Sequence, residues 1–134
     1  MILEKKYNEI TLISGDAGGS EILYRICKKI DSKLNIYTDG PAKTIFSEFR
    51  NISKSVLNKK ILSSDLLLCT SSFTDHTYYE AIQFSKKYNI YTVLVLDHWT
   101  FFYERVLKNE DDYLPDEIIV FDEHAKYILD KLFT

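Results

Sequence analysis

Short apolar runs alternate regularly with amphipathic segments along this chain of 134 residues, and that alternation restricts the fold more than any other feature. The apolar runs have the length of buried strands, whereas the segments between them repeat apolar residues with helical spacing. This pattern predicts parallel strands that are covered by helices on both faces. Strands are expected at residues 9–14, 34–38, 53–57, 65–70, 90–96 and 117–121, of which 53–57 is the weakest.

The predicted fold is a single α/β domain over residues 1–134, a doubly wound, Rossmann-like arrangement of three layers. Right-handed crossovers favour the strand order 3-2-1-4-5-6, or a five-stranded sheet if residues 53–57 form no strand. Helices are expected at residues 20–30, after Pro41, at residues 77–88 and at the C-terminal end. The third of these begins with Thr77-Tyr78-Tyr79-Glu80, a capping-box pattern.

The composition excludes several classes of function. The net charge is −3, and the paired lysines are flanked by acidic or apolar residues, so no stripe for nucleic acid is expected. The apolar runs are too short to span a bilayer, and the first residues lack the apolar core of a signal peptide. Cys27 and Cys69 fall at positions predicted to be buried, which favours reduced thiols in a cytoplasmic protein.

All three histidines follow an apolar run, and each has an acid within two positions: His76, His98 and His124. The carboxyl ends of parallel strands meet at one edge of the sheet, where ligands bind, so these side chains are expected to line that edge. Imidazoles and carboxylates could hold zinc, but no H-x-x-x-H spacing supports a metal site. We therefore expect neither a metal nor a resident cofactor.

A glycine-rich turn joins the first strand to the first helix. It contains Gly15, Asp16, Gly18, Gly19 and Ser20. Glycines allow a tight turn and a close approach of an anion to the amides at the helix N-terminus. The spacing differs from the G-x-G-x-x-G of a dinucleotide site, although Asp39 follows the second strand where a ribose-binding acid would stand. The alternative interpretation is a structural turn in which Ser20 caps the helix.

Two further loops carry candidate ligand-binding residues. The first is rich in hydroxyls that could hold a phosphate or a sugar, and contains Ser71, Ser72, Thr74 and His76; helix capping is the alternative. The second contains Asp97, His98 and Trp99, with Arg105 just after it. Trp99 could stack on a sugar and Arg105 could pair with an anion, whereas the alternative is that Trp99 packs the sheet edge while Asp97 caps.

These residues resemble the amino-terminal Rossmann half of GT-B-type glycosyltransferases and UDP-N-acetylglucosamine 2-epimerase-like proteins. The resemblance covers nearly the whole chain and rests on residues 14–21, 39–42, 96–99 with Tyr103 and Arg105, and 114–116. It implies an acceptor-side or nucleotide-sugar-related domain of a transferase or epimerase in polysaccharide biosynthesis. The glycine turn would then approach a phosphate or an acceptor, and His98 or Asp97 would be the catalytic base.

Proteins of that superfamily contain two Rossmann domains that face each other, whereas this sequence accounts for one. We therefore expect activity to require a second Rossmann domain or a partner subunit. The small-molecule partner would be a nucleotide-sugar or a sugar-phosphate. The alternative function is a non-catalytic module that binds a nucleotide or a sugar-phosphate, and fold analogy alone does not decide between the two.

Overall fold

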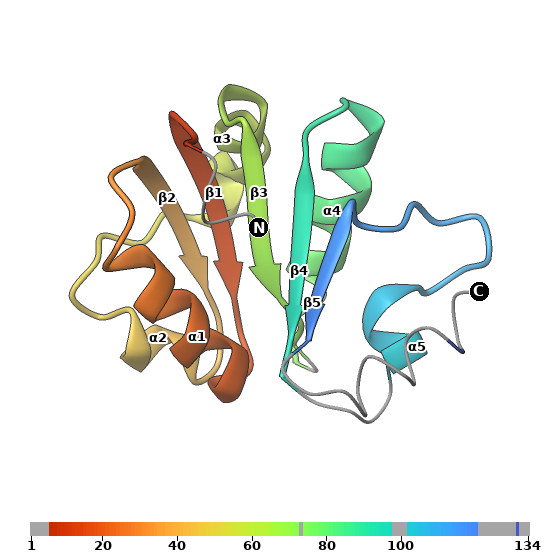
Figure 1. The fold of residues 1–134 in the computed structure, drawn as a ribbon, viewed down its shortest axis with the longest axis horizontal. Helices are drawn as coiled ribbons and strands as arrows, with labels where there is room; N and C mark the ends of the chain where they lie inside the picture. Colours follow the sequence, from red (N-terminus) through yellow and green to blue (C-terminus); the bar gives the residue numbers. More distant parts are fainter. Residues whose placement is uncertain (1–5, 73, 98–101, 121–130, 132–134) are drawn as a thin grey trace.

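Five parallel strands form one sheet in the computed structural model, which describes residues 6–72, 74–97, 102–120 and 131 (Figure 1). The strand order is β2-β1-β3-β4-β5. The strands of this sheet are β1 (Glu9–Ser14), β2 (Lys33–Thr38), β3 (Leu66–Thr70), β4 (Thr92–Leu96) and β5 (Glu117–Val120). The helices of the described residues include α1 (Ala17–Cys27), α2 (Ala42–Ile45), the 3-10 turn η2 (Lys54–Val56), α3 (Leu57–Ser63), α4 (Thr77–Lys87) and α5 (Phe102–Val106).

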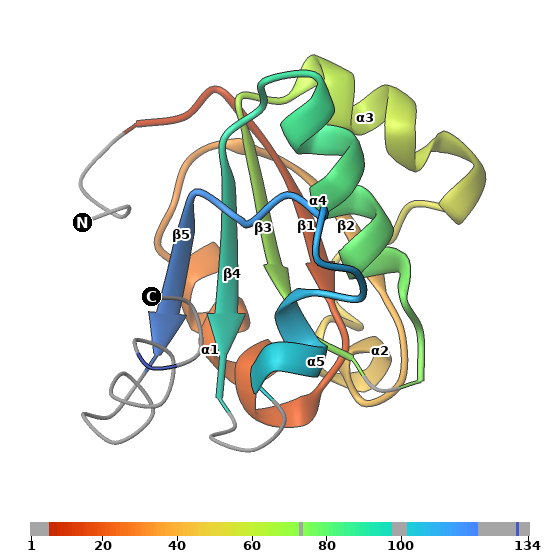
Figure 2. The same ribbon diagram turned by 90° about the vertical axis from the view of Figure 1, so that its right-hand side faces the viewer.

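Helices cover both faces of the sheet, so the predicted doubly wound, Rossmann-like fold is confirmed (Figure 2). α1 and α2 pack on one face, whereas α3, α4 and α5 pack on the other. Successive residues of a strand point to opposite faces, and this divides β3 between two apolar cores: Leu66 and Leu68 belong to the core under α1, and Leu67 and Cys69 to the core under α3 and α4. Burial on both faces explains why this strand is apolar throughout.

The sheet has five strands, and the six-stranded version of the prediction is wrong. Residues 53–57 form η2 and the first residue of α3. One isolated parallel bridge, between Ile36 and Asn51, stands where the additional strand would have paired with β2. The physical reason is the composition of the segment: Val56 is exposed, and only Leu57 contributes to the core. A stretch with so little apolar surface gains more as a helix with one buried face.

One predicted helix start and one predicted helix cap need correction. α1 begins at Ala17, so Gly18 and Gly19 lie in its first turn, and Ser20 lies inside the helix rather than capping it. α4 begins at Thr77 as expected, but the capping box does not form. Its first backbone amide, that of Thr77, donates instead to the Asp75 carboxylate at 2.9 Å. The aspartate two positions earlier therefore accepts the Thr77 amide that a capping box would pair with the Glu80 side chain.

Both cysteines are buried free thiols, as predicted: Cys27 is the last residue of α1, and Cys69 lies within β3. Burial raises the pKa of Cys27 to about 12 and also raises the pKa of Cys69, so neither forms a thiolate readily near neutral pH. Among the described residues, no helix has the length and the apolar character needed to cross a bilayer.

Candidate functional site

The loops at the carboxyl ends of β1 to β4 meet at one edge of the sheet, at the lower end of the strands in Figure 1. The described members of the predicted site lie in these loops or at the start of the helices that follow them: Gly15, Asp16, Gly18, Gly19, Ser20, Ser71, Ser72, Thr74, His76, Asp97 and, on α5, Arg105. His98, Trp99 and His124 lie outside the described residues. The chain turns toward α1 after β1 and toward α4 after β3, so the switch point of the winding lies between these neighbouring strands.

Buried hydroxyl groups hold the glycine turn in place. The Gly15 amide donates to Thr70 Oγ1 at 3.0 Å, and Ser14 Oγ and Ser20 Oγ share a hydrogen bond of 2.6 Å. A Cβ on Gly19 would come within 2.7 Å of Thr70 Cγ2, which shows how closely α1 approaches the sheet here. The role of Ser20 is therefore to satisfy a buried hydroxyl, and Ser14 and Thr70 are members of this network that were not predicted.

A buried guanidinium connects three loops of the edge. Arg105, on α5, is 2% exposed, and its Nη1 donates to Asp16 Oδ2 at 2.6 Å and to Ser71 Oγ at 2.5 Å. Ser71 Oγ donates to Asp16 Oδ2 at 3.2 Å, and the Asp16 amide donates to the Ser71 carbonyl at 3.1 Å. Asp16, Ser71 and Arg105 thus form one hydrogen-bonded cluster at the switch point. The guanidinium that was predicted to meet an anionic ligand meets a carboxylate of its own chain.

Asp39 and Ser72 form a second buried contact beside the glycine turn. Ser72 Oγ donates to Asp39 Oδ1 at 2.8 Å, and a Cβ on Gly15 would lie within 3.0 Å of the same carboxylate oxygen. Burial raises the pKa of Asp39; the Ser72 hydrogen bond lowers it less, and the nearby Asp75 and Asp16 carboxylates add to the increase. In this arrangement Asp39 acts as a structural acceptor for Ser72, and Gly15 packs against it.

Replacing Asp39 with asparagine is expected to flatten the pH dependence of stability. Because folding raises the pKa of this carboxyl, its contribution is fully present below the ordinary value of 3.8 and is lost as pH rises through the folded-state pKa. The substituted amide would keep an oxygen that accepts from Ser72 but would not ionise. Urea denaturation at several pH values should therefore show the variant gaining stability relative to the wild type as pH rises above about 4. A constant difference between the two proteins would contradict this assignment.

Asp75 orders the loop between β3 and α4. Its carboxylate accepts from the Thr77 amide at 2.9 Å and from the Tyr37 hydroxyl at 2.8 Å. Partial burial acts to raise the pKa of Asp75, but hydrogen bonds from the Thr77 hydroxyl, the Thr77 amide and the Tyr37 hydroxyl outweigh it, and the pKa is lowered. Thr74 and His76 lie exposed on either side. They are therefore accessible to a ligand, whereas the tie to Tyr37 could not be predicted because β2 and this loop are distant in sequence.

Asp97 is an exposed carboxylate, and it lies directly over the first turn of α1. A Cβ on Gly18 would fall 1.5 Å from Asp97 Oδ2, so the glycine leaves the space that this side chain occupies. No described side chain caps the N-terminus of α1. The positive end of the helix dipole therefore faces a carboxylate from the end of β4. The fold thus brings Gly18 and Asp97 together, although they are distant in the sequence.

The edge is rich in carboxylates, and this limits its chemistry. Asp16 is paired with Arg105 and Asp39 accepts from Ser72, while Asp97 is exposed. At an effective dielectric constant of about 20, a phosphate at about 4 Å from an unpaired carboxylate meets a repulsion of roughly 4 kcal/mol. The hydroxyl groups of a sugar would instead donate hydrogen bonds to that carboxylate. Among the described residues no group of three or more His, Cys, Asp or Glu side chains could hold a metal ion.

Comparisons with known proteins add no family to this description. The chain matches no protein-family model, no curated protein sequence and no solved structure.

Proposed function

We propose that this domain binds a hydroxyl-bearing sugar at the carboxyl edge of its sheet, as the acceptor-side half of a glycosyltransferase or epimerase-like enzyme. A second Rossmann domain or a partner subunit would supply the rest of the active site. The observation that carries the proposal is the exposed Asp97 carboxylate over Gly18 at the switch-point edge. Asp97 would accept a hydrogen bond from the sugar and would be a candidate base for removing the hydroxyl proton.

The surroundings of Asp97 support this role. The Asp16, Ser71 and Arg105 cluster fixes the turn that precedes Gly18, and the close approach of Gly19 to Thr70 fixes the helix behind it. A carboxylate that stands on such a rigid support can select a hydroxyl group by position. Thr74 and His76, both exposed on the neighbouring loop, would complete the contact with the sugar.

The alternative is a non-catalytic module that binds a nucleotide or a sugar-phosphate. The uncapped N-terminus of α1 favours it, because backbone amides at that position bind phosphates when the carboxylate moves aside. A dinucleotide ranks third, since the glycine spacing is wrong and Asp39, which would hold the ribose, is buried against Ser72. The repulsion from the carboxylates makes the sugar the leading ligand.

Replacing Gly18 with valine is expected to abolish ligand binding without unfolding the domain. The new side chain displaces the Asp97 carboxylate and blocks the approach to the first turn of α1. Thermal-shift measurements with free sugars, UDP-sugars, nucleoside phosphates and NAD would identify the ligand class, because a ligand that binds the folded state raises the melting temperature. NMR titration of the same ligand into the variant would then measure the loss of binding affinity.

Replacing Asp97 with asparagine or alanine separates the two functions. A sugar site loses affinity in both variants, because the charged acceptor is gone. A phosphate site gains affinity, because a repelling charge is gone. Binding of UDP and of a UDP-sugar with equal strength would favour the non-catalytic module, and sugar affinity that survives Gly18→Val would refute the site.

A further inference from the structure

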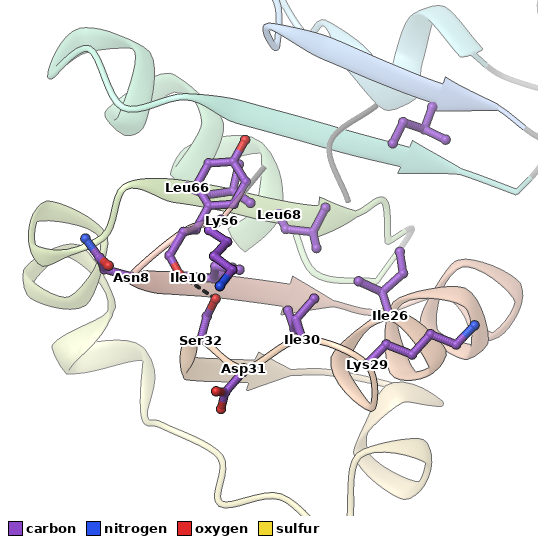
Figure 3. Close-up of a pocket in the computed structure, with 12 residues that line it drawn as sticks. Lys6, Asn8, Ile10, Ile26, Lys29, Ile30, Asp31, Ser32, Leu66 and Leu68 are labelled. Carbon is purple, nitrogen blue, oxygen red and sulfur yellow. Dashed lines mark hydrogen bonds between the residues drawn. The ribbon is translucent and has the colours of Figure 1, made fainter. Parts of the chain in front are cut away.

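A second pocket lies far from the carboxyl edge, at the amino ends of β1 and β3 and beside the C-terminal end of α1 (Figure 3). Its volume is about 410 Å³, within the range of roughly 300 to 1,000 Å³ that is typical of small-molecule sites. The apolar walls are formed by Ile10, Ile26, Ile30, Leu66, Leu68 and Ile119. None of the loops of the proposed sugar site contributes to it.

The pocket has an apolar floor and an ammonium group above it. Figure 3 shows Lys6 reaching across the strands with its ammonium turned toward Ile30 and Ser32, while the Asp31 carboxylate points away from Leu66 and Leu68. Ser32 Oγ is already used, because it donates to the Tyr7 carbonyl at 2.6 Å. In the described part of the chain, the ion pairs include neither Lys6 nor Lys29 at the rim.

We infer that this pocket binds a small amphipathic anion, with an apolar chain along the floor and a carboxylate at Lys6. Ile26, Ile30 and Ile119 are half-buried, and a hydrocarbon chain that covers them would lower the free energy by removing apolar surface from water. Ile10, Leu66 and Leu68 are already buried and would contribute packing contacts. Lys6 is exposed and the described ion pairs do not include it, so its ammonium can form a charge-assisted hydrogen bond with a carboxylate. The charge thus selects an anion, and the walls select its chain.

Sodium decanoate, below its micellar concentration, is the probe that tests this inference, and decanol is the uncharged comparison. Titration into the full chain, followed by methyl NMR, should shift the resonances of Ile10, Leu66 and Leu68 in a saturable manner. Ile26→Trp would fill the pocket from its helical wall on α1 and should weaken decanoate binding about tenfold or more. Ile22→Trp is the matched control, because Ile22 is half-buried on the same helix but does not line the pocket.

The head group is tested separately. Lys6→Gln should weaken decanoate binding several-fold and leave decanol binding unchanged, and Lys6→Arg should restore the affinity for decanoate. The inference is overturned if decanoate leaves these methyl resonances unmoved, if Ile26→Trp binds it as the Ile22→Trp control does, or if decanol binds as tightly as decanoate to the wild type. Circular dichroism of each variant shows whether it is folded before its affinity is compared.

Discussion

Replacing Arg105 with alanine is expected to lower the free energy of unfolding by roughly 3 kcal/mol, because breaking a buried ion pair leaves the other charge without compensation. The guanidinium is 2% exposed and donates to both Asp16 and Ser71. The loss of stability is therefore expected to be that of a buried ion pair and not the small loss of an exposed one. Arg105→Lys should recover only part of the stability, since one ammonium cannot reproduce the planar geometry of the guanidinium. Urea denaturation at neutral pH measures the change.

Lys28→Ala is the control for this experiment. Lys28 forms an ion pair with Glu48 at 2.9 Å, but both side chains are about half exposed, at 52% and 49%. Exposed pairs of this kind contribute about 0 to 1 kcal/mol. A loss in Arg105→Ala no larger than that of Lys28→Ala would mean that the cluster at the switch point does not support the fold. The sugar-binding proposal would then lose the rigid support for Gly18.

Replacing Gly15 with alanine is expected to cost about 2 kcal/mol, which is typical of forcing one extra carbon into a packed interior. The new Cβ would meet Ser72 Cβ at 2.6 Å and Asp39 Oδ1 at 3.0 Å. The first of these atoms is attached directly to the backbone, so relief requires the loop after β3 to move. Thermal or urea denaturation should show the loss, and the Ser72–Asp39 hydrogen bond should weaken with it.

Gly18→Ala, three positions away in the same turn, is the matched control. Its Cβ would meet the end of the exposed Asp97 side chain, which can rotate away, so the change in stability is expected to stay within about 0.5 kcal/mol. The two glycines therefore have opposite roles: Gly15 is required by packing, and Gly18 leaves room at the proposed site. Equal losses in both variants would contradict that distinction.

The order of strands and the class of fold could be predicted because they depend on patterns that are local in sequence. β3 and β4 are buried along their whole length, and their apolar runs indicate burial on both faces, while the helices between the strands show a repeated apolar face. Residues 53–57 are too polar for a buried strand, and the predicted sheet without them has five strands. Because crossovers between parallel strands are right-handed, only a few strand orders are then possible. The gathering of the glycine turn, Ser71 and Asp97 at one edge is a direct consequence.

The interactions of the site could not be predicted, because they join residues that are distant in the chain. The glycine turn was predicted to face a ligand through its helix, and Arg105 to face an anion. The fold instead places Arg105 against Asp16, 89 positions earlier, and Asp97 over Gly18. Likewise Asp75, rather than Glu80, accepts the first amide of α4. A buried polar side chain forms hydrogen bonds with groups that reduce the free-energy cost of its burial. The spacing of residues in the sequence does not indicate which of these groups lie within reach.

The sequence by itself determined a parallel, doubly wound sheet with its loops at one edge, since hydrophobic periodicity and chain handedness act segment by segment. Only the tertiary structure decided which polar groups support that edge and which remain exposed. The same residue types, aspartate and glycine, serve as buried support at Asp39 and Gly15 and as an open surface at Asp97 and Gly18. The difference is made by the packing of Ser72, from the loop after β3, against Gly15 and Asp39, because a close-packed interior leaves almost no space in which a side chain could move to relieve a clash.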